Sequence, residues 1–175
     1  PSNSPEQGGL VMGPTMDHQI IRCLFQACVE ASRVLKLDEA DQALVARLGQ
    51  MIPRLAPNQI GQHGQLQEWL EDKDHPKNTH RHVSHLFAVY PDAQITPRAT
   101  PELAAAARRS LELRISDASD RSIGGWSVAW LALLWARFAE GALAHEQLNN
   151  VLRKSTDISL LDLSPPGGTN PLTVF

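Results

Sequence analysis

Apolar residues recur every three or four positions along much of the chain, and this spacing predicts α-helices. The first helix is expected over about residues 15–35, with Thr15 as its cap and Asp17 in its first turn. Its apolar positions predict one buried stripe, made of Ile20, Leu24, Ala27, Ala31, Val34 and Leu35.

Further helices follow the same spacing. One begins at the capping residue Asp38 and ends near Met51, before Pro53. The others are predicted at about residues 84–89, 100–113, 127–139 and 143–154. The helix over 127–139 is apolar nearly all round, so we expect it to lie inside something larger.

The remaining segments are predicted to be loops, at residues 1–14, 56–82 and 115–124. Residues 56–82 lack helical spacing, and one short strand pair is expected around Ile60 and Leu66. A loop this long in a compact domain is usually functional or disordered, and its Trp69 and clustered histidines favour function. The pattern indicates an all-α fold, and its helix pairs favour an α/α toroid.

Composition narrows the classes of protein that remain. The 175 residues suffice for one domain, and the net charge of −3 with dispersed Lys and Arg argues against nucleic acid. The longest apolar run, residues 131–136, is far too short to cross a membrane. Cys23 and Cys28 would point about 140° apart on a helix, so no disulfide is expected between them. The chain opens without methionine and stops on an apolar segment, which indicates a fragment of a longer protein.

The segment Asn78-Thr-His-Arg-His-Val-Ser-His-Leu86 is the densest concentration of polar donors in the chain. A zinc site is one interpretation, because His80, His82 and His85 lie near a second set of candidate ligands, Asp72, Asp74 and His75. The spacing is not a standard catalytic zinc signature, so no metal or cofactor is predicted. The favoured interpretation is a site that binds a sugar through polar groups brought together from several loops.

Five motifs carry a family resemblance. They are Pro-Ser-Asn-Ser-Pro-Glu6, Gly-Pro-Thr-Met-Asp17, Gly-Gln-Leu-Gln-Glu-Trp69, His-Arg-His-Val-Ser-His-Leu86 and Gly-Gly-Trp-Ser127. Their order resembles glycoside hydrolase family 95, which contains inverting α-1,2-L-fucosidases. The resemblance implies that residues 1–175 are part of an (α/α)6 barrel catalytic domain. It further implies a secreted or extracytoplasmic enzyme without a cofactor.

The resemblance also implies the catalytic residues. Inversion needs two carboxyl groups about 6.5–9.5 Å apart, with room for a water between them and the sugar. Glu6 matches the general acid of the family. Asp120 is the expected base and Asp117 the second candidate, because the segment before Trp126 is longer than the family pattern.

The expected sugar-binding residues are Arg81, His82, His85 and Trp126. Two alternatives stay open: Arg81 forms an ion pair with Glu68 or Asp72, and His85 is a buried support. The other tryptophans, Trp69, Trp130 and Trp135, are expected to pack.

The function implied by the resemblance is hydrolysis of terminal α-L-fucose, 1,2-linked, on a fucosylated glycan. The alternatives are an α-L-galactosidase of the same family and a non-catalytic carbohydrate-binding helical domain. The expected partner is the remainder of the chain's own catalytic domain. Because the family positions the attacking water with two asparagines from an upstream segment, the isolated fragment is expected to be inactive.

Overall fold

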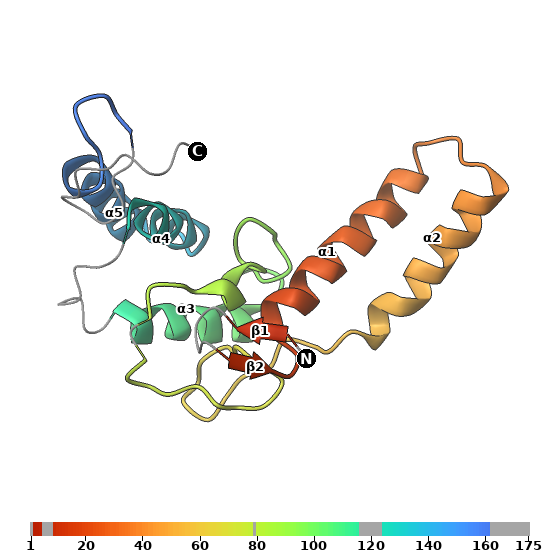
Figure 1. Ribbon diagram of the computed structural model, residues 1–175, viewed down its shortest axis with the longest axis horizontal. Helices are drawn as coiled ribbons and strands as arrows, with labels where there is room; N and C mark the ends of the chain where they lie inside the picture. The colour runs from red at the N-terminus through yellow and green to blue at the C-terminus, as the bar shows by residue number, and fades with distance from the viewer. Residues whose placement is uncertain (1, 5–8, 79, 116–123, 162–175) are drawn as a thin grey trace.

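The structure is a computed structural model that describes residues 2–4, 9–78, 80–115 and 124–161. Its described part is all-α apart from two short strands, as the apolar spacing predicts (Figure 1). The α-helices are α1 (Thr15–Ser32), α2 (Glu39–Met51), α3 (Pro101–Ile115), α4 (Gly125–Arg137) and α5 (Gly141–Lys154). Two 3₁₀ turns are η1 (Ile52–Arg54) and η2 (Ser84–Leu86). This architecture confirms the predicted fold class and agrees with part of an (α/α)6 barrel.

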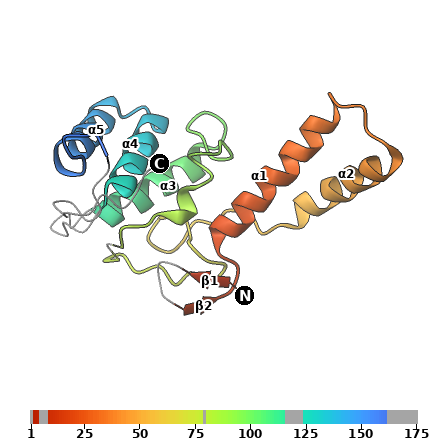
Figure 2. The ribbon, with the colours of Figure 1, turned by 45° about the horizontal axis from the view of Figure 1, so that its top comes forward.

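Helices α1 and α2 form a hairpin that extends away from the rest of the molecule in both ribbon views (Figures 1 and 2). Asp38 caps α2 as predicted, because its Oδ1 accepts the backbone N–H of Asp41 at 2.9 Å. Cys23 and Cys28, both on α1, are free thiols.

Two expectations for α1 are wrong. Thr15 is the first helical residue rather than the cap, and its hydroxyl donates to the backbone carbonyl of Gln67 at 2.7 Å. The predicted apolar stripe is largely exposed, with Leu24 at 58% and Val34 at 86%. The stripe has the right spacing, but in the described residues the main contacts of α1 are with α2, η1 and η2.

The apolar core lies where α3, α4 and the segment after η2 meet. Its largest buried side chains include Leu86, Ile95, Leu111, Leu134 and Trp135. Trp135 is core as predicted, whereas Trp130 is half-buried and packs at the edge of the core.

In the described part of the chain helix α4 is buried on one side only, and the expectation that it lies inside something larger stays a prediction. Leu133 is 41% exposed and Trp126 is 44% exposed. Helix α4 packs mainly on α5, and the turn between them places Ala139 at φ 60°. That left-handed conformation lets the N–H of Glu140 bond to the carbonyl of Trp135, which closes the helix end.

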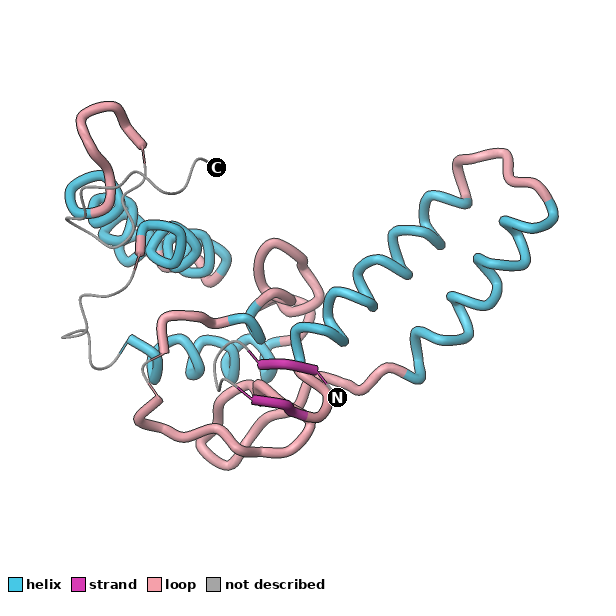
Figure 3. Tube along the Cα trace, in the orientation of Figure 1, coloured by secondary structure: helices cyan, strands magenta, loops and turns pink. Residues whose placement is uncertain are grey.

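The loops between α2 and α3 lie at the base of the α1–α2 hairpin and around α3 (Figure 3). The predicted strand pair is confirmed as a single antiparallel bridge between Ile60 and Leu66. The helix expected over 84–89 is only the 3₁₀ turn η2. Residues 1–14 are not wholly loop, because β1 (Ser2–Ser4) pairs antiparallel with β2 (Gly9–Val11).

Candidate functional site

The histidine motif is the segment 78–86, and its described residues before η2 are held by local hydrogen bonds. The backbone N–H of His80 donates to Asn78 Oδ1 at 3.0 Å, and the N–H of His82 donates to His80 Nδ1 at 3.2 Å. His80 and His82 are half-buried, and Arg81 between them is exposed. The motif therefore presents Arg81 to solvent from a backbone that is held by its own side chains.

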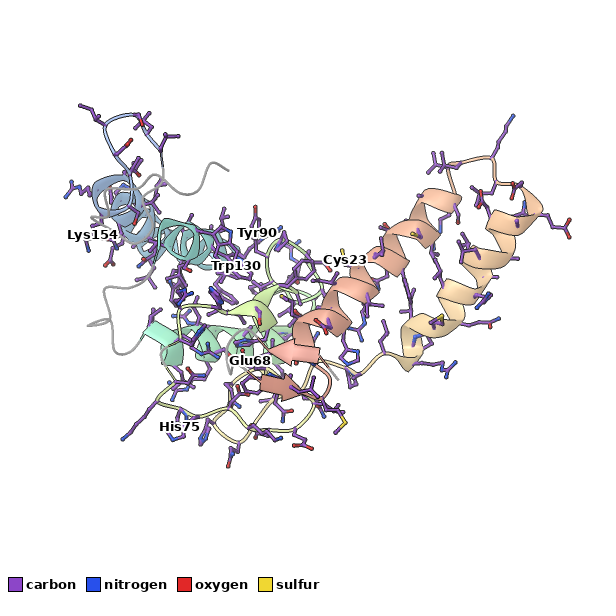
Figure 4. All side chains as sticks on the ribbon, viewed as in Figure 1. Cys23, Glu68, His75, Tyr90, Trp130 and Lys154 are labelled. Atoms are coloured by element: carbon purple, nitrogen blue, oxygen red, sulfur yellow. The ribbon has the colours of Figure 1, made fainter. Side chains whose placement is uncertain are left out.

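Aromatic rings connect the motif to α4. The His80 and His82 rings meet edge-on with centroids 5.0 Å apart, and the His82 and Trp126 rings meet edge-on at 5.9 Å. The ring centroids of Trp126 and Trp130 are 5.1 Å apart. The Nε1 of Trp130 donates to the carbonyl of Tyr90 at 2.9 Å, and Figure 4 labels both residues. Two motifs that are 44 residues apart in sequence thus share one surface, where Trp126 is 44% exposed.

A buried charged cluster lies behind the motif. Arg114, on the inner face of α3, pairs with Glu68, and both side chains are almost fully buried. The Nη1 of Arg114 also donates to the backbone carbonyls of His82 at 2.6 Å and His80 at 3.3 Å. His85 is 2% exposed, and its Nδ1 lies 3.9 Å from Glu68 Oε2.

His85 is held in its neutral form. Burial lowers the pKa of His85 well below its usual value, and the positive charge of Arg114 lowers it further. A neutral imidazole beside a carboxylate that is already paired with an arginine is a packing group. The burial of His85 agrees with the alternative that it is a buried support. Its role in binding sugar stays a prediction.

The loop before the motif is folded around acidic side chains. Gln65 Nε2 donates to Asp72 Oδ1 and to Asp74 Oδ2, both at 3.1 Å, and Asp74 Oδ2 also accepts the N–H of Glu68 at 3.1 Å. Burial raises the pKa of Asp74 despite these bonds. Gly61 is required here because a Cβ at that position would lie 2.1 Å from Gln65 Nε2. The loop therefore delivers Glu68 to the cluster in a fixed position.

The structure brings together some of the expected site residues. The rings of His82 and Trp126 are in contact, and Arg81 precedes His82 in the sequence. Glu6, Asp117 and Asp120 lie outside the described residues. Of the two acids weighed as ion-pair partners of Arg81, Glu68 pairs with Arg114, and Asp72 accepts hydrogen bonds from the N–H of Gln62 and the side-chain amide of Gln65.

The pairing of Glu68 with Arg114 was not predicted from the sequence. Arg114 continues the helical face of Ala107 and Leu111, which is a signal in the sequence, whereas the burial of Glu68 and its neighbours is known only from the structure. Trp69, 3% exposed, packs as expected. Among the described residues, no three His, Cys, Asp or Glu side chains are grouped as a metal site would require.

Comparison with known proteins decides the family. Residues 1–167 match the family described as glycosyl hydrolase family 95 catalytic domain. The chain belongs to glycosyl hydrolase family 95.

Three relatives of this family 95 chain are similar over most of its length. Alpha-L-fucosidase 2 of Arabidopsis thaliana is 33% identical over 86% of the chain and 18% of its own length. Probable alpha-fucosidase A of Aspergillus oryzae is 29% identical over 100% of the chain and 25% of its own length. Probable alpha-fucosidase A of Aspergillus niger is 27% identical over 95% of the chain and 22% of its own length.

The family 95 chain thus spans about a fifth to a quarter of the relatives that it matches. None of its helices, within the described residues, has both the length and the apolar character needed to cross a membrane.

Proposed function

We propose that this chain is part of the catalytic domain of an α-L-fucosidase that removes terminal α-1,2-linked L-fucose from a glycan with inversion. Family membership supports a glycoside hydrolase, and the names of the three relatives support fucose as the sugar. The observation that carries the proposal is the contact of the His82 ring with Trp126, beside the exposed Arg81.

That surface has the chemistry needed to bind a monosaccharide. A guanidinium offers several N–H donors in a fixed plane, and an imidazole offers a donor and an acceptor. The exposed indole of Trp126 offers an apolar face with an N–H at its edge. Fucose has hydroxyl groups for the first two and an apolar ring face and methyl group for the third.

The proposed reaction uses Glu6 and Asp120, with Asp117 as the second candidate for the base. Glu6 gives its proton to the glycosidic oxygen as the bond from that oxygen to C1 breaks. Asp120 takes a proton from the water whose oxygen bonds to C1 on the opposite face. The products are β-L-fucose and the free hydroxyl of the aglycone.

The exposed apolar stripes support the view that this chain works as part of a larger catalytic domain. Leu24 on α1, Val34 and Leu35 in the turn after it, and Leu44 on α2 are all more than half exposed. Helices with such stripes are normally covered by another element. We therefore propose that the remainder of the domain covers them, and that residues 1–175 alone do not turn over substrate.

The proposal is tested with the full-length enzyme on a fucosyl-α-1,2-galactoside, by NMR of the first product formed. Initial release of β-L-fucose is expected, whereas α-L-fucose would exclude inversion and no release would exclude the fucosidase. Glu6→Gln should abolish turnover, and Glu30→Gln, which changes an exposed acid on α1, should leave it unchanged. Asp120→Asn and Asp117→Asn identify the base, because only the variant of the true base loses activity.

A further inference from the structure

Arg114 bonds to three acceptors through one guanidinium group. Its Nη2 pairs with Glu68, and its Nη1 donates to the backbone carbonyls of His80 and His82. Given the proposed function, we propose that Arg114 and Glu68 are positioning residues, which hold the backbone before Arg81 and after His82 so that Arg81 and His82 meet the sugar in one orientation.

The carbonyl of His80 lies in the peptide before Arg81, and the carbonyl of His82 lies in the peptide after His82, so the two bonds enclose the Arg81-His82 pair. Both carbonyls are directed to the buried guanidinium, while the Arg81 side chain is exposed. Holding both carbonyls restrains the 80–81 and 82–83 peptide planes, which limits the directions in which the side chains of Arg81 and His82 leave the backbone. A binding side chain that starts from a fixed backbone loses less conformational freedom when the sugar binds.

Glu68 gives this arrangement a rigid reference. Its backbone N–H donates to Asp74 Oδ2 at 3.1 Å, and its carbonyl accepts the N–H of Thr15 at 2.9 Å. Glu68 is thereby bonded to the start of α1 and to Asp74, which follows it in the same loop. Arg114 is part of α3. The motif is held against two helices at once (Figure 4, where Glu68 is labelled).

Stability alone is a weak reason for such a pair. The cost of removing two charges from water often cancels their attraction, so apolar residues can give equal stability. An arginine also differs from a lysine here, because only its planar fork reaches a carboxylate and a carbonyl pair in fixed directions. The geometry points to orientation of the motif as the purpose of the pair.

The test uses Arg114→Lys and Arg114→Met in the full-length enzyme, with Arg108→Met as the matched control. Arg108 lies on the same helix and pairs with Glu112 and Glu140, but its side chain is 41% exposed and bonds to no part of the histidine motif. Lysine keeps the buried positive charge but lacks the fork. The readouts are KM and kcat on the fucoside, the inhibition constant of free L-fucose, the urea midpoint, and hydrogen exchange of residues 78–86.

We expect Arg114→Lys to raise KM and the L-fucose inhibition constant at least tenfold and to speed exchange in residues 78–86, with a smaller effect on kcat. Arg108→Met should lower the urea midpoint without moving either constant. Wild-type constants and exchange in Arg114→Lys would overturn the proposal, because charge compensation would then suffice.

Two results separate this proposal from the proposed function. Absence of fucoside hydrolysis by the wild-type enzyme refutes the function, while hydrogen exchange still reports whether Arg114 holds the motif. If neither Arg114 variant folds, exchange of the wild-type His82 and Leu86 amides decides. Exchange as slow as that of buried α3 amides supports the positioning role of Arg114 and Glu68. Exchange as fast as that of exposed loops overturns it.

Discussion

Replacing Gln19 by leucine is expected to destabilise the protein, because three hydrogen bonds, two of them buried, end on the side-chain amide of Gln19. Its Nε2 donates to Asn58 Oδ1 at 2.8 Å and to the carbonyl of His85 at 2.9 Å, and its Oε1 accepts the N–H of Ala88 at 3.0 Å. The side chain is fully buried, so water cannot replace these partners. Gln19 thus joins α1 to η2 and to the core segment that follows.

The magnitude follows from the groups left behind. The carbonyl of His85 and the N–H of Ala88 belong to buried residues, and each buried unpaired group costs about 1–3 kcal/mol. Burying a leucine side chain offsets about 1.5–3 kcal/mol of that total. With about 2 kcal/mol for each of the two groups and about 2 kcal/mol offset by the leucine, the net loss in the free energy of unfolding is expected to be about 2 kcal/mol.

The assay is urea unfolding of the full-length protein, followed by tryptophan fluorescence, with midpoint and slope compared. Gln26→Leu is the control, because Gln26 is an exposed residue of the same helix and should change stability by no more than about 0.5 kcal/mol. If Gln19→Leu and Gln26→Leu have the same midpoint as the wild type, the three hydrogen bonds do not stabilise the fold and the reasoning fails.

Two further predictions concern pH and backbone strain. Since burial and the charge of Arg114 lower the folded-state pKa of His85, only the unfolded chain gains its proton as the pH falls below about 6.5. Stability should therefore decrease on acidification by up to about 1.4 kcal/mol per pH unit from this residue, and His85→Gln should remove that part of the slope in urea titrations; equal slopes would contradict the buried neutral imidazole. Ala139→Gly should raise the free energy of unfolding by about 0.5–1 kcal/mol, because Ala139 has φ 60°, whereas Ala132→Gly inside α4 should lower it by about 1 kcal/mol. A midpoint for Ala139→Gly at or below that of the wild type would exclude strain at Ala139.

Local patterns predict the helices well, because a helix is held by contacts between residues three or four apart. Asp38 caps α2 as expected, and the helix starting near Thr100 is found as α3. Burial is predicted less well, because it depends on what packs against the helix. The stripe of α1 has helical spacing and is nevertheless exposed.

The candidate site depends on contacts that no local pattern contains. Contact between His82 and Trp126 joins segments 44 residues apart, and only the family resemblance placed both in one site. Thr15 illustrates the same limit. Its sequence context favours a cap, but its hydroxyl donates instead to the carbonyl of Gln67, in the loop before the histidine motif. The roles of Glu6 and Asp120 rest on the resemblance and stay predictions.

Arg114 shows how more of the site could be found from sequence. Ala104, Ala107 and Leu111 mark the buried face of α3, and Arg114 continues that face. A charged side chain on a buried face must have a buried partner of opposite charge, because an unpaired buried charge costs several kcal/mol. The spacing of α3 therefore predicts a buried acid as the partner of Arg114, and the structure identifies that acid. Glu68 meets the condition, since its neighbours from Gln65 to Trp69 are all buried. Charged residues at positions where the spacing predicts burial are thus the sequence feature that leads to the groups behind a binding motif, even where no relative is known.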